Sequence, residues 1–120
     1  MAKIILLMNP ISGTGDKAGL RAMISLKLEQ WQLPYEFLPT DPTGQYTELR
    51  SKLRTEAIHR IIIIGGDGTV SHTTAALRDL RIEFAVIPAG SGNGLARAAN
   101  IPTDPVSALE LAIHGKAQLI

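Results

Sequence analysis

The run Ile61-Ile62-Ile63-Ile64, directly followed by Gly65-Gly66-Asp67-Gly68-Thr69, constrains the fold of this chain more than any other feature. Consecutive β-branched residues favour the pleated backbone, and a continuous apolar run is typical of a strand buried on both faces. Glycine after such a strand permits a tight turn or a close approach of the backbone to a ligand. The sequence therefore predicts a buried strand that leads into a glycine-rich loop.

The pattern of an apolar run followed by glycines occurs at two further places. Ile4–Met8 precedes Asn9-Pro10-Ile11-Ser12-Gly13-Thr14-Gly15, and Phe84–Ile87 precedes Pro88-Ala89-Gly90-Ser91-Gly92-Asn93-Gly94. Tyr35–Leu38 is a shorter strand candidate. Apolar residues at helical spacing predict helices over 17–31, 45–57, 70–80, 94–99 and from Asp104-Pro105 to the residue before Gly115, and Ala117–Ile120 resembles the beginning of another strand.

Regular alternation of strands and helices predicts an α/β fold with an open, mostly parallel sheet and helices on both faces. Its crossovers are expected to be right-handed. The carboxyl ends of parallel strands meet at one edge, where ligands of such sheets bind. We therefore expect the three glycine-rich loops to come together at that edge.

Composition limits the classes of function. The length of 120 residues suits one domain, over 1–120. A net charge of +1 without a block of like charge, together with 4% aromatic residues, argues against nucleic acid as a partner. The absence of cysteine excludes a thiolate metal site and fits a cytoplasmic protein, and no apolar run is long enough to span a membrane. The scattered cations Arg50, Lys52, Arg54 and Arg60 are expected on solvated faces.

The three loops suit an oligophosphate ligand. Glycine allows backbone N–H groups to approach phosphate oxygens, and each following helix adds unpaired N–H groups and a positive dipole end. Ser12, Thr69, Ser91 and Asn93 supply short side-chain donors. Asp67 would repel phosphate, unless a Mg²⁺ ion lies between them, directly or through water.

Common nucleotide motifs do not account for these loops. The Walker A pattern Gly-Lys-Ser/Thr does not occur, and the first loop is a poor match to the dinucleotide fingerprint. A single glycine-rich loop is explained equally well as an ordinary strand-to-helix turn. Three such loops at one edge, one of them with a central acid, favour a ligand site.

Taken together, the motifs Asn9–Gly13, Gly65–Thr69 and Pro88–Gly94, the last followed by Leu95-Ala96-Arg97, resemble the signatures of the diacylglycerol kinase catalytic domain family. They occur in the family's order, and the resemblance covers essentially the whole chain. It implies the Rossmann-like N-terminal domain that NAD kinases and diacylglycerol kinases share. It also implies ATP and Mg²⁺ as cofactors and a lipid as the substrate.

The resemblance implies roles for individual residues. Nucleotide contacts would come from Asn9, Pro10, Ile11, Ser12, Gly13, Thr40, Gly65, Gly66, Asp67, Gly68, Thr69, Val70, Ser71, His72, Ser91 and Asn93, with Asp67 also near the metal, directly or through water. The sequence departs from the family at Ser71-His72, where Asn-Glu is usual, and at Asn93-Gly94, where Asn-Asp is common. These departures leave one nucleotide contact and the lipid substrate open.

Length is the larger departure, because the family has a second, β-rich domain that supplies the general base and further Mg²⁺ ligands. We therefore expect this chain to be the ATP-binding half of a lipid kinase that phosphorylates diacylglycerol or a related lipid, inactive alone. It would be cytoplasmic, with transient contact at the membrane surface, and a homodimer is possible. Alternatives are an NAD kinase-like enzyme and a stand-alone, non-catalytic nucleotide-binding module.

Overall fold

The computed structural model describes residues 2–8, 17–88 and 105–114. Its elements are β1 (Lys3–Met8), α1 (Lys17–Gln30), β2 (Tyr35–Leu38), α2 (Thr47–Thr55), β3 (Ile58–Gly65), α3 (Asp67–Ala76), β4 (Glu83–Pro88) and α5 (Pro105–His114). The predicted helix over 94–99 and the predicted strand Ala117–Ile120 lie outside the described residues. No helix in the described ranges is long and apolar enough to span a bilayer.

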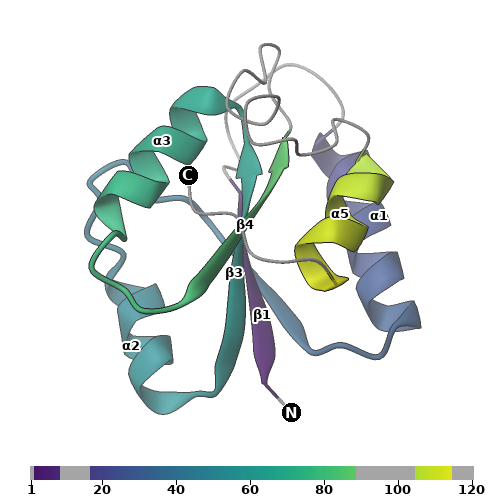
Figure 1. The fold of residues 1–120 in the computed structure, drawn as a ribbon, viewed down its shortest axis with the longest axis horizontal. Coiled ribbons are helices and arrows are strands. Elements are labelled where there is room, and N and C mark those ends of the chain that lie inside the picture. The colour runs from purple at the N-terminus through teal and green to yellow at the C-terminus, as the bar shows by residue number, and fades with distance from the viewer. Residues whose placement is uncertain (1, 9–16, 89–104, 115–120) are drawn as a thin grey trace.

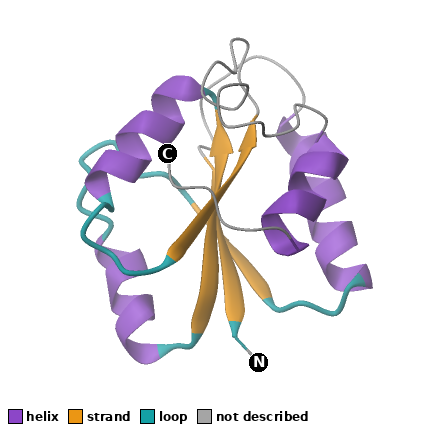
Figure 2. Cartoon of the chain, viewed as in Figure 1, coloured by secondary structure: helices purple, strands orange, loops and turns teal. Residues whose placement is uncertain are grey.

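The four strands form one sheet in the order β2-β1-β3-β4, and all of their pairings are parallel. Helices α2 and α3 cover one face of the sheet, and α1 and α5 cover the other (Figure 1, Figure 2). This arrangement confirms the predicted α/β fold with a parallel sheet between two layers of helices.

Continuous apolar strands fill the centre of the molecule. Ile4–Leu7 and Ile61–Ile64 are at most 2% exposed, because helices cover both faces of the sheet at β1 and β3. The helices add buried residues to this core: Ile24 and Leu28 from α1, Leu49 from α2, Val70 and Leu77 from α3, and Ala108, Leu109 and Ala112 from α5. The isoleucine run is thus buried on both faces, as its sequence predicts.

Two helices begin at residues other than the predicted ones. Helix α3 begins at Asp67 rather than at Val70, so that Asp67, Gly68 and Thr69 form its first turn and only Gly66 precedes it as the N-cap. Helix α2 begins at Thr47, because Tyr46 adopts the left-handed conformation (φ 49°, ψ 46°) and ends the preceding turn. Both differences affect the candidate site.

Arg60 was expected on a solvated face, and the structure shows that this prediction is wrong. Its side chain is 7% exposed and forms an ion pair with Glu83 on the neighbouring strand, with 2.8 Å between Nη2 and Oε2. The same guanidinium donates a hydrogen bond to the backbone carbonyl of Ala112 in the last turn of α5. An arginine at the beginning of an apolar strand therefore joins the sheet to a helix.

Lys52 is also more than a solvated cation. It belongs to a ring of alternating charges, defined by Lys3, Glu36, Lys52 and Glu56, in which each lysine pairs with both glutamates. The ring joins β1, β2 and α2 on one side of the molecule. The four side chains are between 20% and 34% exposed, so water partly screens their interactions.

Candidate functional site

The strand order reverses between β1 and β3, since the chain continues from β1 to β2 on one side and from β3 to β4 on the other. Ligands of open α/β sheets bind beyond the carboxyl ends of the strands at such a point. Met8 pairs with Ile64, and Gly65 pairs with Pro88, so that β1, β3 and β4 end side by side. The three strands that precede the glycine-rich segments in the sequence therefore end at one edge of the sheet.

Gly65 joins the end of β3 to the first turn of α3 at very close range. A Cβ atom at this position would lie 2.9 Å from both Cβ and Cγ2 of Thr69, which is closer than side-chain carbons pack. Any larger residue would have to displace the first turn of α3. Glycine at position 65 is thus required by the close packing of strand and helix.

Gly68 differs, because the fold does not require a glycine there. A Cβ atom at Gly68 would meet no described atom within 4 Å, and the residue is exposed on the first turn of α3. Glycine within a helix is less stable than alanine by about 1 kcal/mol. The absent side chain leaves open space beside the helix N-terminus, where a bound group could approach the backbone closely.

The first turn of α3 has the character of an anion site. No side chain among the described residues caps the helix at Gly66. The first N–H groups of a helix have no partner within the helix and carry the positive end of its dipole. Val70 donates its N–H to the carbonyl of Gly66 at 3.0 Å, which closes the first turn of the helix.

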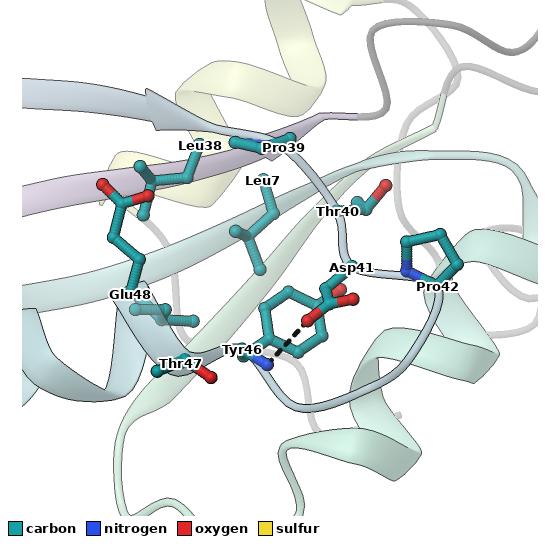
Figure 3. A pocket seen from close by; sticks show the side chains of 10 residues that line it. Leu7, Leu38, Pro39, Thr40, Asp41, Pro42, Tyr46, Thr47 and Glu48 are labelled. Carbon is teal, nitrogen blue, oxygen red and sulfur yellow. Dashed lines mark hydrogen bonds between the residues drawn. The ribbon is translucent and has the colours of Figure 1, made fainter.

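Opposite α3 lies the turn between β2 and α2, which carries Thr40. The carboxylate of Asp41 holds this turn: Oδ1 accepts hydrogen bonds from the backbone N–H of Thr43 (2.9 Å) and its hydroxyl (2.7 Å), and Oδ2 accepts one from the N–H of Tyr46 (2.9 Å; Figure 3). These bonds lower the pKa of Asp41, with the Thr43 hydroxyl as the largest cause. Asp41 is therefore a charged organiser of the turn.

Tyr46 connects the turn to α3. Its side chain is 4% exposed, and its hydroxyl is hydrogen-bonded to the hydroxyl of Thr73, with 3.3 Å between the oxygens. Gly44, with φ 77°, gives a second point where the turn lies close to α3. A Cβ atom at Gly44 would lie 3.5 Å from the Cβ atom of Ala76. The turn and the helix are thus packed directly against each other.

Two neighbouring cavities flank the turn. The first, the α3 cavity, has a volume of about 300 Å³ and is lined by Thr40, Pro42, Gly68, Thr69, His72 and Thr73. The second, the turn cavity, has about 260 Å³ and is lined by Leu7, Leu38, Pro39, Thr40, Asp41, Pro42, Tyr46, Thr47, Glu48 and Leu49 (Figure 3). Because only the α3 cavity reaches the first turn of α3, it is the candidate site for a phosphorylated ligand.

Several residues predicted for the site line the α3 cavity together. Thr40 comes from the turn, while Gly68, Thr69 and His72 come from α3, about 30 positions further along the chain. The side chain of Val70 is 2% exposed and belongs to the core, and Ser71 is exposed but does not line the cavity. The predicted residues Asn9, Pro10, Ile11, Ser12, Gly13, Ser91 and Asn93 lie outside the described residues.

Sequence reasoning missed Asp41, Pro42, Tyr46 and Thr73. Asp41 could have been found, because an aspartate two residues before a threonine in a Pro- and Gly-rich segment is a common turn arrangement. No local signal pairs Tyr46 with Thr73, which are 27 residues apart. Tyr46 falls within the helix predicted over 45–57, but the structure places it before the first residue of α2.

Asp67 lies in the first turn of α3, where a carboxylate suits the helix dipole. Within the described ranges, no group of three or more His, Asp or Glu side chains could hold a metal ion. Mg²⁺ commonly binds proteins through one or two carboxylates and completes its shell with phosphate and water oxygens. Asp67 fits that role as a single protein ligand, in the presence of a bound phosphate.

Comparison with known proteins agrees with this geometry. The sequence model of the family described as "Diacylglycerol kinase catalytic domain" matches residues 3–120. The "Probable lipid kinase YegS-like" of Cronobacter sakazakii is 32% identical over 108 residues, which are 87% of this chain and 36% of that protein. The "Diacylglycerol kinase" of Mycobacterium tuberculosis is 30% identical, and the match covers all of this chain and 39% of that protein.

A crystal structure of a diacylglycerol kinase from Bacillus anthracis superimposes with a TM-score of 0.71 and 29% identity, over 91% of this chain and 38% of that one. The chain therefore spans between a third and two fifths of the length of these relatives. The family match over nearly every residue and the agreement in fold lead to one conclusion: this chain belongs to the diacylglycerol kinase catalytic domain family.

Proposed function

We propose that this chain is the nucleotide-binding part of an ATP-dependent lipid kinase and that it does not complete phosphoryl transfer alone. One observation supports this above the others. The α3 cavity lies beyond the carboxyl ends of β2 and β3, between Thr40 and the first turn of α3, which no described side chain caps, and the missing side chain of Gly68 leaves room for a ligand.

In the proposed reaction, a lipid hydroxyl oxygen forms a bond to the γ-phosphorus of ATP as the bond to the β-phosphate oxygen breaks. The chain would bind the phosphates with the N–H groups of Gly66 to Thr69 and place the nucleoside between Thr40 and α3. Asp67 would ligate Mg²⁺, which neutralises phosphate charge when it is bound. Asn9 to Gly13, Ser91 and Asn93 would complete the site from the other two glycine-rich segments.

The remaining parts of the reaction are assigned to residues beyond this chain. The base that takes the hydroxyl proton, further metal ligands and most of the lipid site would come from a second domain. In that larger enzyme we propose a cytoplasmic location with transient contact at the membrane surface, and a possible homodimer. The relatives named as lipid and diacylglycerol kinases favour a lipid over NAD as the phosphate acceptor.

Gly68→Ala provides the sharpest test of the cavity. Its Cβ atom would enter open space, so the fold is expected to be as stable as the wild type or up to about 1 kcal/mol more stable. The same methyl group would occupy the space of the ligand, and affinity for Mg²⁺–ATP should fall about tenfold or more. Calorimetric titration and urea unfolding of the same samples would measure both effects.

Gly65→Ala is the matched control, since it should lower stability through the contact with Thr69. Unchanged ATP affinity in a folded Gly68→Ala variant would contradict the proposed site. Incubation of the chain with labelled ATP and diacylglycerol vesicles should give no phosphatidic acid, and robust production would refute the need for a second domain. Turnover with NAD but none with lipid would reverse the choice of acceptor.

A further inference from the structure

The two walls of the α3 cavity belong to different elements. Thr40 and Pro42 come from the turn after β2, whereas Gly68, Thr69, His72 and Thr73 come from α3. The width of the cavity is therefore set by whatever holds the turn at its distance from the helix. Among the described residues, the polar link nearest to the cavity is the hydrogen bond between the hydroxyls of Tyr46 and Thr73.

The turn connects Tyr46, and so its hydrogen bond to Thr73, with Thr40. Asp41 bonds to the N–H groups of both Thr43 and Tyr46, so that the backbone from 41 to 46 is closed into one unit next to Thr40. A displacement of Tyr46 would consequently move Asp41 and, with it, the adjacent threonine.

The conformation of Tyr46 shows that its surroundings determine its position. A residue with a side chain rarely adopts the left-handed backbone, and tertiary contacts must stabilise it where it occurs. The ring is buried, and Thr73 is only 1% exposed, so water does not compete for the bond between their hydroxyls. Thr73 also lines the α3 cavity, which places this bond directly in the cavity wall.

We propose that Tyr46 is a positioning residue of the nucleotide site: its hydrogen bond to Thr73 sets the distance between Thr40 and α3 and thereby the fit of the nucleoside. This inference rests on the proposed function. The inference predicts that the phosphates and the nucleoside of ATP depend on different residues. The phosphates would depend on the first turn of α3, whereas the nucleoside, which lies between the two walls, would depend on Tyr46.

The test compares Tyr46→Phe with Tyr35→Phe in the 120-residue chain. Both changes remove one tyrosine hydroxyl and its hydrogen bond, but the hydroxyl of Tyr35 bonds to exposed Glu29, 3.0 Å away and outside the cavity lining. Tyr46→Phe should weaken ATP binding about threefold to tenfold, the range that one hydrogen bond provides, and leave tripolyphosphate binding unchanged. Tyr35→Phe should leave both affinities unchanged.

Changes at Thr73 test the same bond from its other side. Thr73→Val should weaken ATP binding, Thr73→Ser should retain it, and the double variant Tyr46→Phe/Thr73→Val should be no worse than either single variant. In the absence of nucleotide, Tyr46→Phe should also shift the amide resonances of Thr40 and Asp41, which Tyr35→Phe should not. Thermal melts would verify that each variant is folded at the temperature of titration.

The positioning role would be overturned if Tyr46→Phe bound ATP within twofold of the wild-type affinity, or if it lost tripolyphosphate affinity in parallel. Neither result would contradict the proposed nucleotide site itself. Unshifted amides of Thr40 and Asp41 would also overturn the positioning role, without any ligand. A wild-type chain that binds neither ATP nor tripolyphosphate would reject the proposed function, and the positioning role with it.

Discussion

Asp41 shows how one side chain organises the turn that carries Thr40. Its carboxylate accepts three hydrogen bonds within five residues, from two backbone N–H groups and one hydroxyl. These donors stabilise the ionised carboxylate, and they lower its pKa from the ordinary value of 3.8. The order of the turn is therefore coupled to the charge of Asp41.

The sign of this coupling predicts an acid-dependent effect of Asp41→Asn. A lowered pKa in the folded chain contributes stability that is present above pH 3.8 and is lost as the pH falls through the folded-state pKa. The variant should be less stable than the wild type at pH 7, and the difference should shrink below pH 3.8. Urea unfolding between pH 3 and 7 would measure it, and a difference that is constant over this range would contradict the role of the charge.

Local and distant partners explain which of these residues the sequence could reveal. The bonds of Asp41 stay within a segment rich in Pro, Thr and Gly, so turn chemistry alone could have predicted them. The partner of Tyr46 lies 27 residues away, and those of Arg60 lie 23 and 52 residues away. Such partners depend on how the elements pack, and local patterns do not encode that.

Among the elements, α5 depends on the sheet through Arg60. The last carbonyl groups of a helix have no partner within it, and they carry the negative end of its dipole. Arg60 donates to one of them, that of Ala112, while its ion pair with Glu83 orients the guanidinium. Arg60 thus joins α5, the helix after the third glycine-rich segment, to β3, the strand before the second glycine-rich segment.

Arg60→Lys should therefore destabilise the chain, although it keeps the charge. A lysine cannot present two donors in the fixed geometry of a guanidinium, and the Ala112 carbonyl would lose its partner in a buried position. The expected loss is about 1–3 kcal/mol in the free energy of unfolding, and Arg54→Lys on the exposed side of α2 should change it little. Equal stability of the two variants would show that the interaction does not hold α5.

At the level of elements, periodicity predicted the fold well, because buried strands and amphipathic helices have clear patterns. All of the described strands were identified, and their parallel order followed from their alternation with helices. The start of α3 was misplaced because Gly-Asp-Gly resembles a loop, whereas the structure includes Asp67 and Gly68 in the helix. Helix propensity is weak enough for packing against β3 to override it.

Over the whole molecule, the charge ring of Lys3, Glu36, Lys52 and Glu56 predicts a broad range of stable pH. Hydrogen bonds to Lys3 lower the pKa of both glutamates from 4.5, and hydrogen bonds to the glutamates raise the pKa of both lysines from 10.5. The carboxylate contribution is lost as the pH falls below 4.5, and the ammonium contribution is lost as it rises above 10.5 through the folded-state values.

Glu36→Gln should accordingly lower stability near neutral pH but have little effect at pH values where the carboxylate is already protonated. Added salt should reduce the difference, because the ring is partly exposed to solvent. Glu110→Gln, an exposed change on α5, serves as the control for loss of one negative charge. Denaturant midpoints of the wild type, Glu36→Gln and Glu110→Gln at pH 3.5 and 7 would measure the effect. Identical midpoints of all three proteins at pH 7 would exclude a stabilising ring.

Gly68 has a consequence for directed evolution of this chain. A library at position 68 that is sorted for resistance to heat should enrich alanine, whereas the same library sorted for retention on immobilised ATP should keep glycine. The two selections would disagree because the position combines an ordinary helical backbone with open space on its outer side. Such opposed preferences at one residue would mark where ligand recognition, rather than folding, determines the amino acid.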